Sequence, residues 1–104
     1  MDFNCSPDKV ACKTMTIEQL KSSGISWRHG AWEYGGRGGQ PMWPGGAPGC
    51  RDACNKDPGC YHWVFDCKDW GCKLYSNGGY EEDGSKQFGR DYCFLGDIDR
   101  KVEL

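Results

Sequence analysis

The chain has no long apolar run. Hydrophobic residues make up 38% of its 104 residues, and glycine and charged side chains interrupt them throughout. A membrane-spanning helix needs about 18 or more consecutive apolar residues. We therefore expect no membrane span, and the length is typical of a single domain covering residues 1–104.

A strong charge of one sign is also missing. The net charge is −2, and Lys and Arg are scattered among Asp and Glu. A protein that binds nucleic acid needs a basic face that follows the phosphates. The run of glycines around Arg37 is better explained as a flexible loop than as an RNA-binding box. Nucleic acid is therefore not an expected partner.

Signatures of catalysis and of metal binding are absent from the sequence as well. It contains no Gly-x-Ser-x-Gly, His-Glu-x-x-His or phosphate-binding motif. Cys50 and Cys54 have the spacing of a zinc knuckle, but no second knuckle follows, and His29 and His62 lack ligand-like spacing. We therefore expect no enzyme, no metal and no cofactor. Two carboxylate clusters are interpreted as solvated surface: Glu81, Glu82, Asp83, Asp97 and Asp99.

Cysteine, in contrast, is abundant. Eight of the 104 residues are cysteines, a density typical of small disulfide-stapled proteins in oxidising compartments. A domain of this size has a marginal core without such bridges. The first five residues lack an apolar leader, so we expect a secreted or cell-surface domain that belongs to a longer multidomain chain. The candidate disulfide residues are Cys5, Cys12, Cys50, Cys54, Cys60, Cys67, Cys72 and Cys93.

Local patterns predict one short helix. It lies in the segment 50–60, and Pro58 ends it because proline cannot continue the backbone hydrogen bonds. Cys50 and Cys54 are four residues apart, so both lie on the helix face that must point to the core. Residues 16–21 are expected to form only a single helical turn, because a Ser-Ser-Gly sequence follows them.

The remaining segments predict a small antiparallel sheet. Residues 25–34 alternate as a strand does, residues 60–76 have the pattern of a hairpin, and residues 88–95 form a last strand. The Gly/Pro/Trp-rich segment at about 35–49 and the segment 77–85 are expected to be loops. The predicted fold class is therefore α+β, disulfide-rich, with one short helix packed on a small antiparallel sheet.

The cysteine block resembles the PAN/Apple domain family. Two cysteines four apart precede an acidic-Pro turn and a third cysteine, and an aromatic strand then leads to another cysteine with an apolar residue two positions on. The match covers about residues 48–76. The matching residues are Cys50, Cys54, Asp57, Pro58, Cys60, Cys72 and Leu74. The resemblance implies the same helix-on-sheet fold.

The resemblance also implies a disulfide framework. In that family the first helix cysteine pairs with the strand cysteine, and the second pairs with the cysteine just past the helix. Carried onto this chain, the bridges are Cys50–Cys72 and Cys54–Cys60. The other cysteines leave two alternatives open: Cys5–Cys93 with Cys12–Cys67, or Cys12–Cys93 with Cys5–Cys67. Cys67 and one N-terminal cysteine are additional to the family pattern.

Aromatic residues are the candidates for binding. Fourteen of the 104 residues are Trp, Tyr or Phe, and flat amphipathic rings suit both sugar faces and protein hot spots. PAN/Apple relatives include lectin-like adhesins, so the resemblance implies a non-enzymatic recognition module that binds an extracellular glycan. The alternative is a protein–protein interaction module. The candidate ligand-binding residues are Trp27, Arg28, His29, Trp32, Tyr34, Arg37, Trp43 and Trp70.

Overall fold

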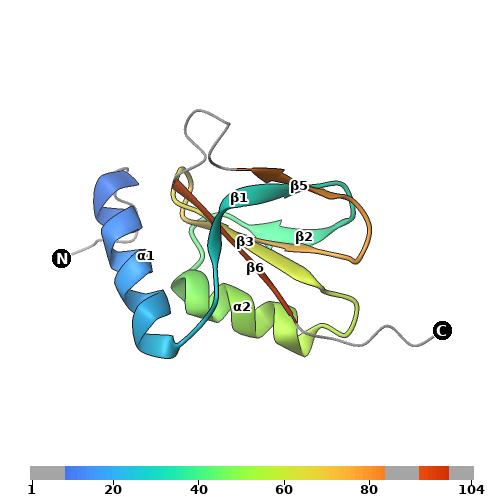
Figure 1. Cartoon of the computed structure of the whole chain (residues 1–104), viewed down its shortest axis with the longest axis horizontal. Helices are drawn as coiled ribbons and strands as arrows, with labels where there is room; N and C mark the ends of the chain where they lie inside the picture. The colour runs from blue at the N-terminus through green and yellow to red at the C-terminus, as the bar shows by residue number, and fades with distance from the viewer. Residues whose placement is uncertain (1–8, 84–91, 99–104) are drawn as a thin grey trace.

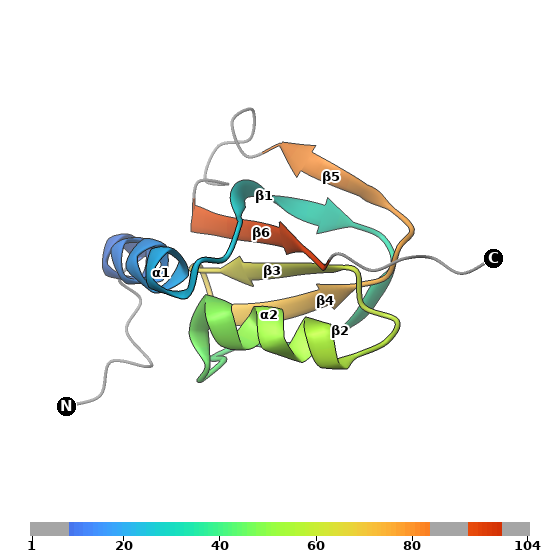
Figure 2. The same cartoon turned by 60° about the horizontal axis from the view of Figure 1, so that its bottom comes forward.

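The computed structural model describes residues 9–83 and 92–98, which form two helices and a six-stranded sheet (Figure 1). The α+β class is confirmed, with two helices in place of the single one predicted. The view in Figure 2 shows α2 on one face of the sheet, running roughly along the strands, and α1 beside the sheet. The elements are α1 (Lys9–Ser23), β1 (Arg28–Glu33), β2 (Gly36–Gln40), α2 (Gly46–Lys56), β3 (His62–Asp66), β4 (Gly71–Tyr75), β5 (Tyr80–Asp83) and β6 (Cys93–Asp97).

The sheet is antiparallel throughout its described pairs, in the order β2-β4-β3-β6-β1-β5. Its centre is β3, where Val64 lies opposite Lys73 of β4 and Leu95 of β6. The predicted hairpin at 60–76 is confirmed as β3 and β4. The predicted first strand is confirmed over β1 and the last over β6, and residues 88–91 of that last strand lie outside the described residues.

The main core lies between α2 and the sheet. Trp63, Phe65 and Phe94 are at most 1% exposed, and Cys50 and Cys54 of α2 are fully buried beside them. The prediction that both helix cysteines point to the core is therefore confirmed. Burying aromatic side chains of this size is the largest favourable contribution to the stability of a small domain.

Three disulfides join this core. Cys50–Cys72 and Cys54–Cys60 form as the family resemblance implied. Cys12–Cys67 is the third, which decides between the two open alternatives and excludes Cys12–Cys93. Cys5, the partner expected for Cys93 in the surviving alternative, lies outside the described residues.

The prediction of a single helical turn at 16–21 is wrong, because α1 has 15 residues. Its buried stripe consists of Cys12, Thr16 and Leu20, spaced four residues apart on one helix face. The stripe is short and one of its three residues is polar, so its period is hard to recognise among the Lys, Thr, Gln and Ser residues around it. The predicted end of this helix at the Ser-Ser-Gly sequence is confirmed, because the helix ends at Ser23 and Gly24 follows it with φ +68°.

The prediction of loops at 35–49 and 77–85 is also wrong in part. β2 occupies 36–40 as an edge strand on β4, and α2 starts at Gly46. β5 occupies 80–83 and pairs with β1, and residues 84–85 of the predicted loop lie outside the described residues. Backbone hydrogen bonds to a neighbouring strand hold such segments, so they form without strand-favouring side chains. Gly39 permits the close pairing, because a Cβ there would lie 3.1 Å from the Cys72 carbonyl oxygen.

Candidate functional site

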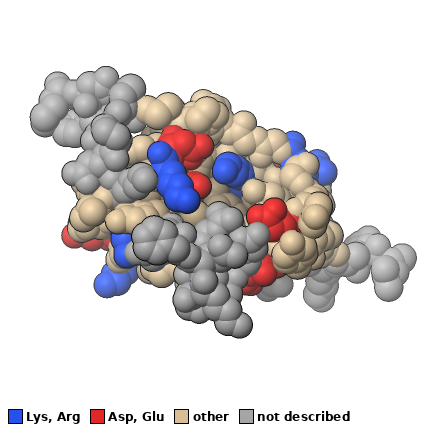
Figure 3. All heavy atoms as spheres, turned by 90° about the horizontal axis from the view of Figure 1, so that it is seen from above, with Lys and Arg blue, Asp and Glu red and all other residues tan. Residues whose placement is uncertain are grey.

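The two faces of the sheet carry separate hydrophobic clusters. Successive side chains of a strand point to opposite faces, so Trp63 and Phe65 pack with the cysteines of α2, whereas Val64 belongs to a second cluster. We call the face of this second cluster the distal face. Its cluster consists of Trp32, Val64, Tyr75, Cys93 and Leu95. Figure 3, seen from the side opposite α2, shows acidic and basic side chains interspersed there.

A cavity of about 460 Å³ lies on the distal face. Trp32, Tyr34 and Tyr75 line it together with Asp66 and Lys73. Asp66 is only 7% exposed, and its carboxylate accepts a hydrogen bond from the Lys68 backbone N–H. Within the described residues Lys73 forms no ion pair. Aromatic walls with a few polar groups are typical of small-molecule sites, and we call this space the distal cavity.

Tyr34 forms one edge of the distal cavity and is held in an unusual backbone conformation. Its φ is +69°, in the left-handed region that side chains other than glycine rarely adopt. The residue is 72% exposed, and its ring lies 5.7 Å from that of Tyr80. Such backbone strain is found where the surrounding structure presents a side chain for function. Tyr34 therefore offers an exposed ring beside a concave surface.

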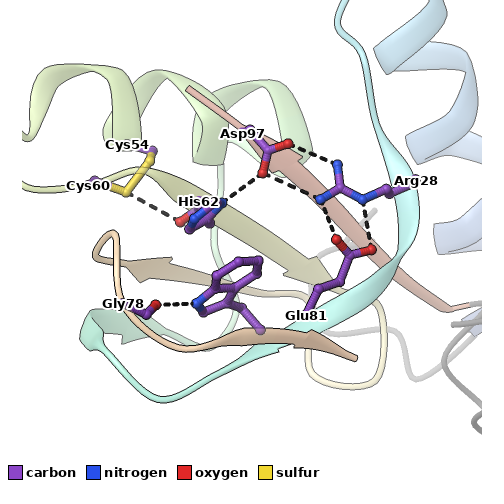
Figure 4. Close-up of polar contacts among 8 residues, drawn as sticks. Arg28, Cys54, Cys60, His62, Gly78, Glu81 and Asp97 are labelled. Carbon is purple, nitrogen blue, oxygen red and sulfur yellow. Dashed lines mark hydrogen bonds and ion pairs between the residues drawn. A yellow bond between two sulfur atoms is a disulfide. The ribbon is translucent and has the colours of Figure 1, made fainter. Parts of the chain in front are cut away.

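Trp32 forms another wall and is fixed on two sides. Its ring stacks on the imidazole of His62, with centroids 3.7 Å apart and planes inclined by 17°. The indole N–H donates a 2.7 Å hydrogen bond to the Gly78 carbonyl oxygen, which Figure 4 shows as a dashed line. The indole is therefore held in place before any ligand binds, which reduces the entropy lost on binding.

A chain of ionisable side chains continues from His62 (Figure 4). His62 Nδ1 lies 2.7 Å from Asp97 Oδ1, and Asp97 accepts a second hydrogen bond from Arg28 at 3.0 Å. Arg28 also binds both carboxylate oxygens of Glu81, with Nε–Oε2 at 2.8 Å. These four residues come from β3, β6, β1 and β5, so the network ties four strands together on the distal face.

The network changes the pKa values of its members. Burial raises the pKa of the Asp97 carboxyl, but hydrogen bonds from Arg28 and His62 and the charge of Arg28 outweigh burial, so the pKa lies below its ordinary value. The hydrogen bond to Glu81 raises the pKa of Arg28. Both groups are therefore ionised at neutral pH, and Asp97 acts as a hydrogen-bond acceptor only.

Other predicted residues lie on the face of the sheet that α2 covers, which we call the covered face. Trp27 packs against the main core, with its ring 5.2 Å from Phe94. His29 lies against the same two rings, and its Nδ1 is 3.2 Å from the Cys93 carbonyl oxygen. Trp27 and His29 thus lie together, on the face of the sheet opposite the distal cavity.

The last three predicted residues also lie away from the distal cavity. Trp43 and Trp70 both pack against the main core, and the Trp43 N–H donates to the Trp70 carbonyl oxygen at 2.7 Å. Arg37 reaches from β2 to Asp57 at the end of α2, with Nε–Oδ2 at 2.7 Å. The distal face thus brings together Arg28, Trp32 and Tyr34 of the predicted set.

Sequence reasoning missed several distal-face residues. The sequence predicts solvated surface for Asp97 and Glu81, and it singles out His62 only as a possible metal ligand without ligand-like spacing. Alternation along the hairpin strand was the available signal, because residues 62, 64 and 66 must share one face. The missing information was which strands flank β3, since His62 and Asp97 are 35 residues apart. The missed residues are His62, Asp66, Lys73, Tyr75, Glu81 and Asp97.

A larger cavity, of about 550 Å³, lies between residues 23–26 and α2. Its lining includes Ser, Asp, Asn and Arg side chains and no aromatic ring, so the distal cavity fits the predicted chemistry better. In the described part of the chain, no cluster of three His, Cys, Asp or Glu side chains has the geometry to hold a metal ion. No described helix has the length and hydropathy needed to cross a membrane.

Comparisons with known proteins leave the family open. No family model matches the chain, and neither a curated protein nor a solved structure shows significant similarity to it.

Proposed function

We propose that this chain is a non-enzymatic recognition module that binds carbohydrate in the distal cavity. The observation that carries the proposal is the combination, in one concave surface, of aromatic walls, a buried carboxylate and an ammonium that forms no ion pair with any described residue. The proposed module is of the PAN/Apple type and extracellular. Supporting the proposal are the bridges Cys50–Cys72 and Cys54–Cys60 and a helix packed on an antiparallel sheet.

The chemistry of a sugar ring matches these groups. One face of a pyranose presents C–H groups that pack on an aromatic ring, and its edge presents hydroxyls that donate and accept hydrogen bonds. Trp32 and Tyr34 supply the rings, the Asp66 carboxylate accepts from hydroxyls, and the Lys73 ammonium donates to them. The volume of about 460 Å³ is within the range of small-molecule sites.

A sugar titration followed by NMR tests this proposal. A panel of neutral, acidic and amino monosaccharides at millimolar concentration is expected to shift signals of residues that line the cavity. Tyr34→Ala is expected to weaken binding about tenfold or more, because it removes a wall at the rim. Tyr80→Ala is the matched control: it removes an exposed neighbouring ring that does not line the cavity. Absence of shifts with every sugar contradicts the proposal.

The second candidate is a protein partner, and one observation favours it. Tyr34 and Tyr80 are 72% and 53% exposed and lie side by side, and exposed aromatic pairs are typical of interface hot spots. The two tyrosine variants separate the candidates. A protein interface predicts that both substitutions weaken capture of an extracellular partner, whereas the sugar site predicts a loss with Tyr34→Ala alone.

A further inference from the structure

The contact between His62 and Trp32 links two strands that are not neighbours. His62 lies on β3 and Trp32 on β1, and β6 lies between these strands in the sheet. Their rings are nevertheless only 3.7 Å apart and nearly parallel. Trp32 also lines the distal cavity. The imidazole therefore supports a wall of the cavity without lining the cavity itself.

The hydrogen bond to Asp97 fixes which nitrogen of His62 carries the hydrogen when the ring is neutral. Asp97 is ionised and accepts hydrogen bonds only, so Nδ1, at 2.7 Å from Oδ1, must carry a hydrogen in both states of the ring. Protonation then adds its hydrogen at Nε2. The side chain is 15% exposed, which leaves the ring accessible to proton exchange with solvent.

The charged network around His62 includes side chains from three other strands. Within the described residues, Arg28 of β1 contributes one positive charge, and Asp97 of β6 and Glu81 of β5 contribute two negative charges. From β4, Tyr75 lies opposite His62 in the register and is uncharged at neutral pH. A neutral His62 therefore leaves the cluster with an excess negative charge, and protonation balances it. Imidazole changes its charge between about pH 5 and 8.

We infer that His62 is a positioning residue of the distal cavity, and that its protonation tightens the hold on Trp32 and thereby strengthens carbohydrate binding at mildly acidic pH. Two contacts strengthen together. The bond to Asp97 becomes charge-assisted, and the stack on the indole becomes a cation–π contact. The carbohydrate part of this inference rests on the proposed function. We expect binding to be about two- to fivefold tighter at pH 5.5 than at pH 7.5.

The protein without ligand provides the decisive test. NMR follows the indole N–H of Trp32 and the ring signals of His62 from pH 5 to 8. We expect Trp32 to shift with the same midpoint as His62. His29 is the internal control, because its ring lies against Trp27 and Phe94 on the covered face. A Trp32 signal that stays constant through the His62 transition, or that follows His29, overturns the inference.

Matched variants distinguish the effect of protonating His62 from the effect of its aromatic ring. His62→Phe keeps an aromatic surface under Trp32 but cannot be protonated, so the pH response of Trp32 should disappear while the indole stays ordered. His29→Phe should leave that response unchanged. Persistence of the Trp32 transition in His62→Phe contradicts the inference. The wild-type titration decides the matter even if this variant fails to fold.

The ligand experiment uses the monosaccharide that produces the largest shifts in the panel. Its Kd is measured at pH 5.5 and 7.5 for the wild type and for His62→Phe. The wild-type ratio should reach two- to fivefold, and the variant ratio should be close to one. Equal wild-type affinities overturn the coupling to binding. If no sugar binds, the proposed function fails, whereas the titration of Trp32 still decides the role of His62.

Discussion

The covered face and the distal face of the sheet place tryptophan in different environments. Trp63 on the covered face is fully buried, and no described residue accepts a hydrogen bond from its indole N–H. Trp32 on the distal face is half-buried, stacks on His62 and donates to the Gly78 carbonyl oxygen. All three disulfides lie in the covered cluster, and the linked ionisable network lies on the distal face.

Under the proposed function, this division separates stability from carbohydrate recognition. The core between α2 and the sheet provides the buried area and the bridges that a small domain needs. The distal face holds the cavity, Tyr34 with its positive φ and the charged network. The comparison predicts that equal substitutions on the two faces have unequal effects.

The largest expected difference is between the two tryptophans. Trp63→Ala should lower the free energy of unfolding by about 3–5 kcal/mol, because it leaves a cavity in the main core. Trp32→Ala should cost about 1–2 kcal/mol, the sum of a lost stack and a lost hydrogen bond. Urea unfolding with intact disulfides measures both values. Equal losses would show that the distal cluster is as important for folding as the main core.

Two disulfides of the covered face are expected to differ in their contribution to stability. Removing Cys50–Cys72 with two alanines should cost about 3 kcal/mol, and removing Cys54–Cys60 about 2 kcal/mol, because the first bridge closes the longer loop. Their sequence separations are 22 and 6 residues. All four cysteines are at most 3% exposed, so the packing losses are similar. Thermal unfolding of the two double variants tests the order, and a reversed order contradicts the loop-length explanation.

A glycine on β6 tests how tightly the covered face is packed. A Cβ at Gly96 would overlap the ring of Trp63, so Gly96→Ala should destabilise the fold by about 1–3 kcal/mol. Gly78→Ala is the control, because a Cβ there would meet no atom within 4 Å. Its effect should be near zero, as measured by the same unfolding experiment. A stable Gly96→Ala variant would show that Trp63 can move.

The smallest expected effect is the pH dependence that Asp97 gives to the distal face. Its folded-state pKa lies below the ordinary value of about 3.8. The resulting stabilisation is therefore present above pH 4 and is lost as the pH falls through the folded-state pKa. Since the side chain is 47% exposed, solvent screening keeps the effect small. Asp97→Asn should lose less stability than the wild type between pH 5 and 2, as measured by thermal unfolding.

The predictions from sequence succeeded where the signal was local. Cys50 and Cys54 share a helix face because they are four residues apart, and the hairpin at 60–76 alternates along its own length. The predictions failed for α1, β2 and β5. The buried stripe of α1 consists of only three residues, and the two strands are held by backbone hydrogen bonds to distant partners.

The residues of the candidate site likewise divide into those that the sequence predicts and those that it does not. Trp32 and Tyr34 were predicted from their aromatic character, and the structure places both in the lining of one cavity. Trp27, Trp43 and Trp70 have the same character, yet they pack against the main core. Composition identifies rings that can bind, but the face of the sheet on which a ring lies depends on strand order and register.

The sequence alone determined a disulfide-rich α+β domain, because cysteine density, helix spacing and strand alternation are local properties of the chain. Only the tertiary structure decided that His62 and Trp32 stack and that Asp97 and Arg28 complete the network. Those residues lie on strands far apart in the sequence, and β6 brings them together by inserting between β3 and β1. Antiparallel pairing across that insertion is a property of the whole sheet, and no single segment encodes it.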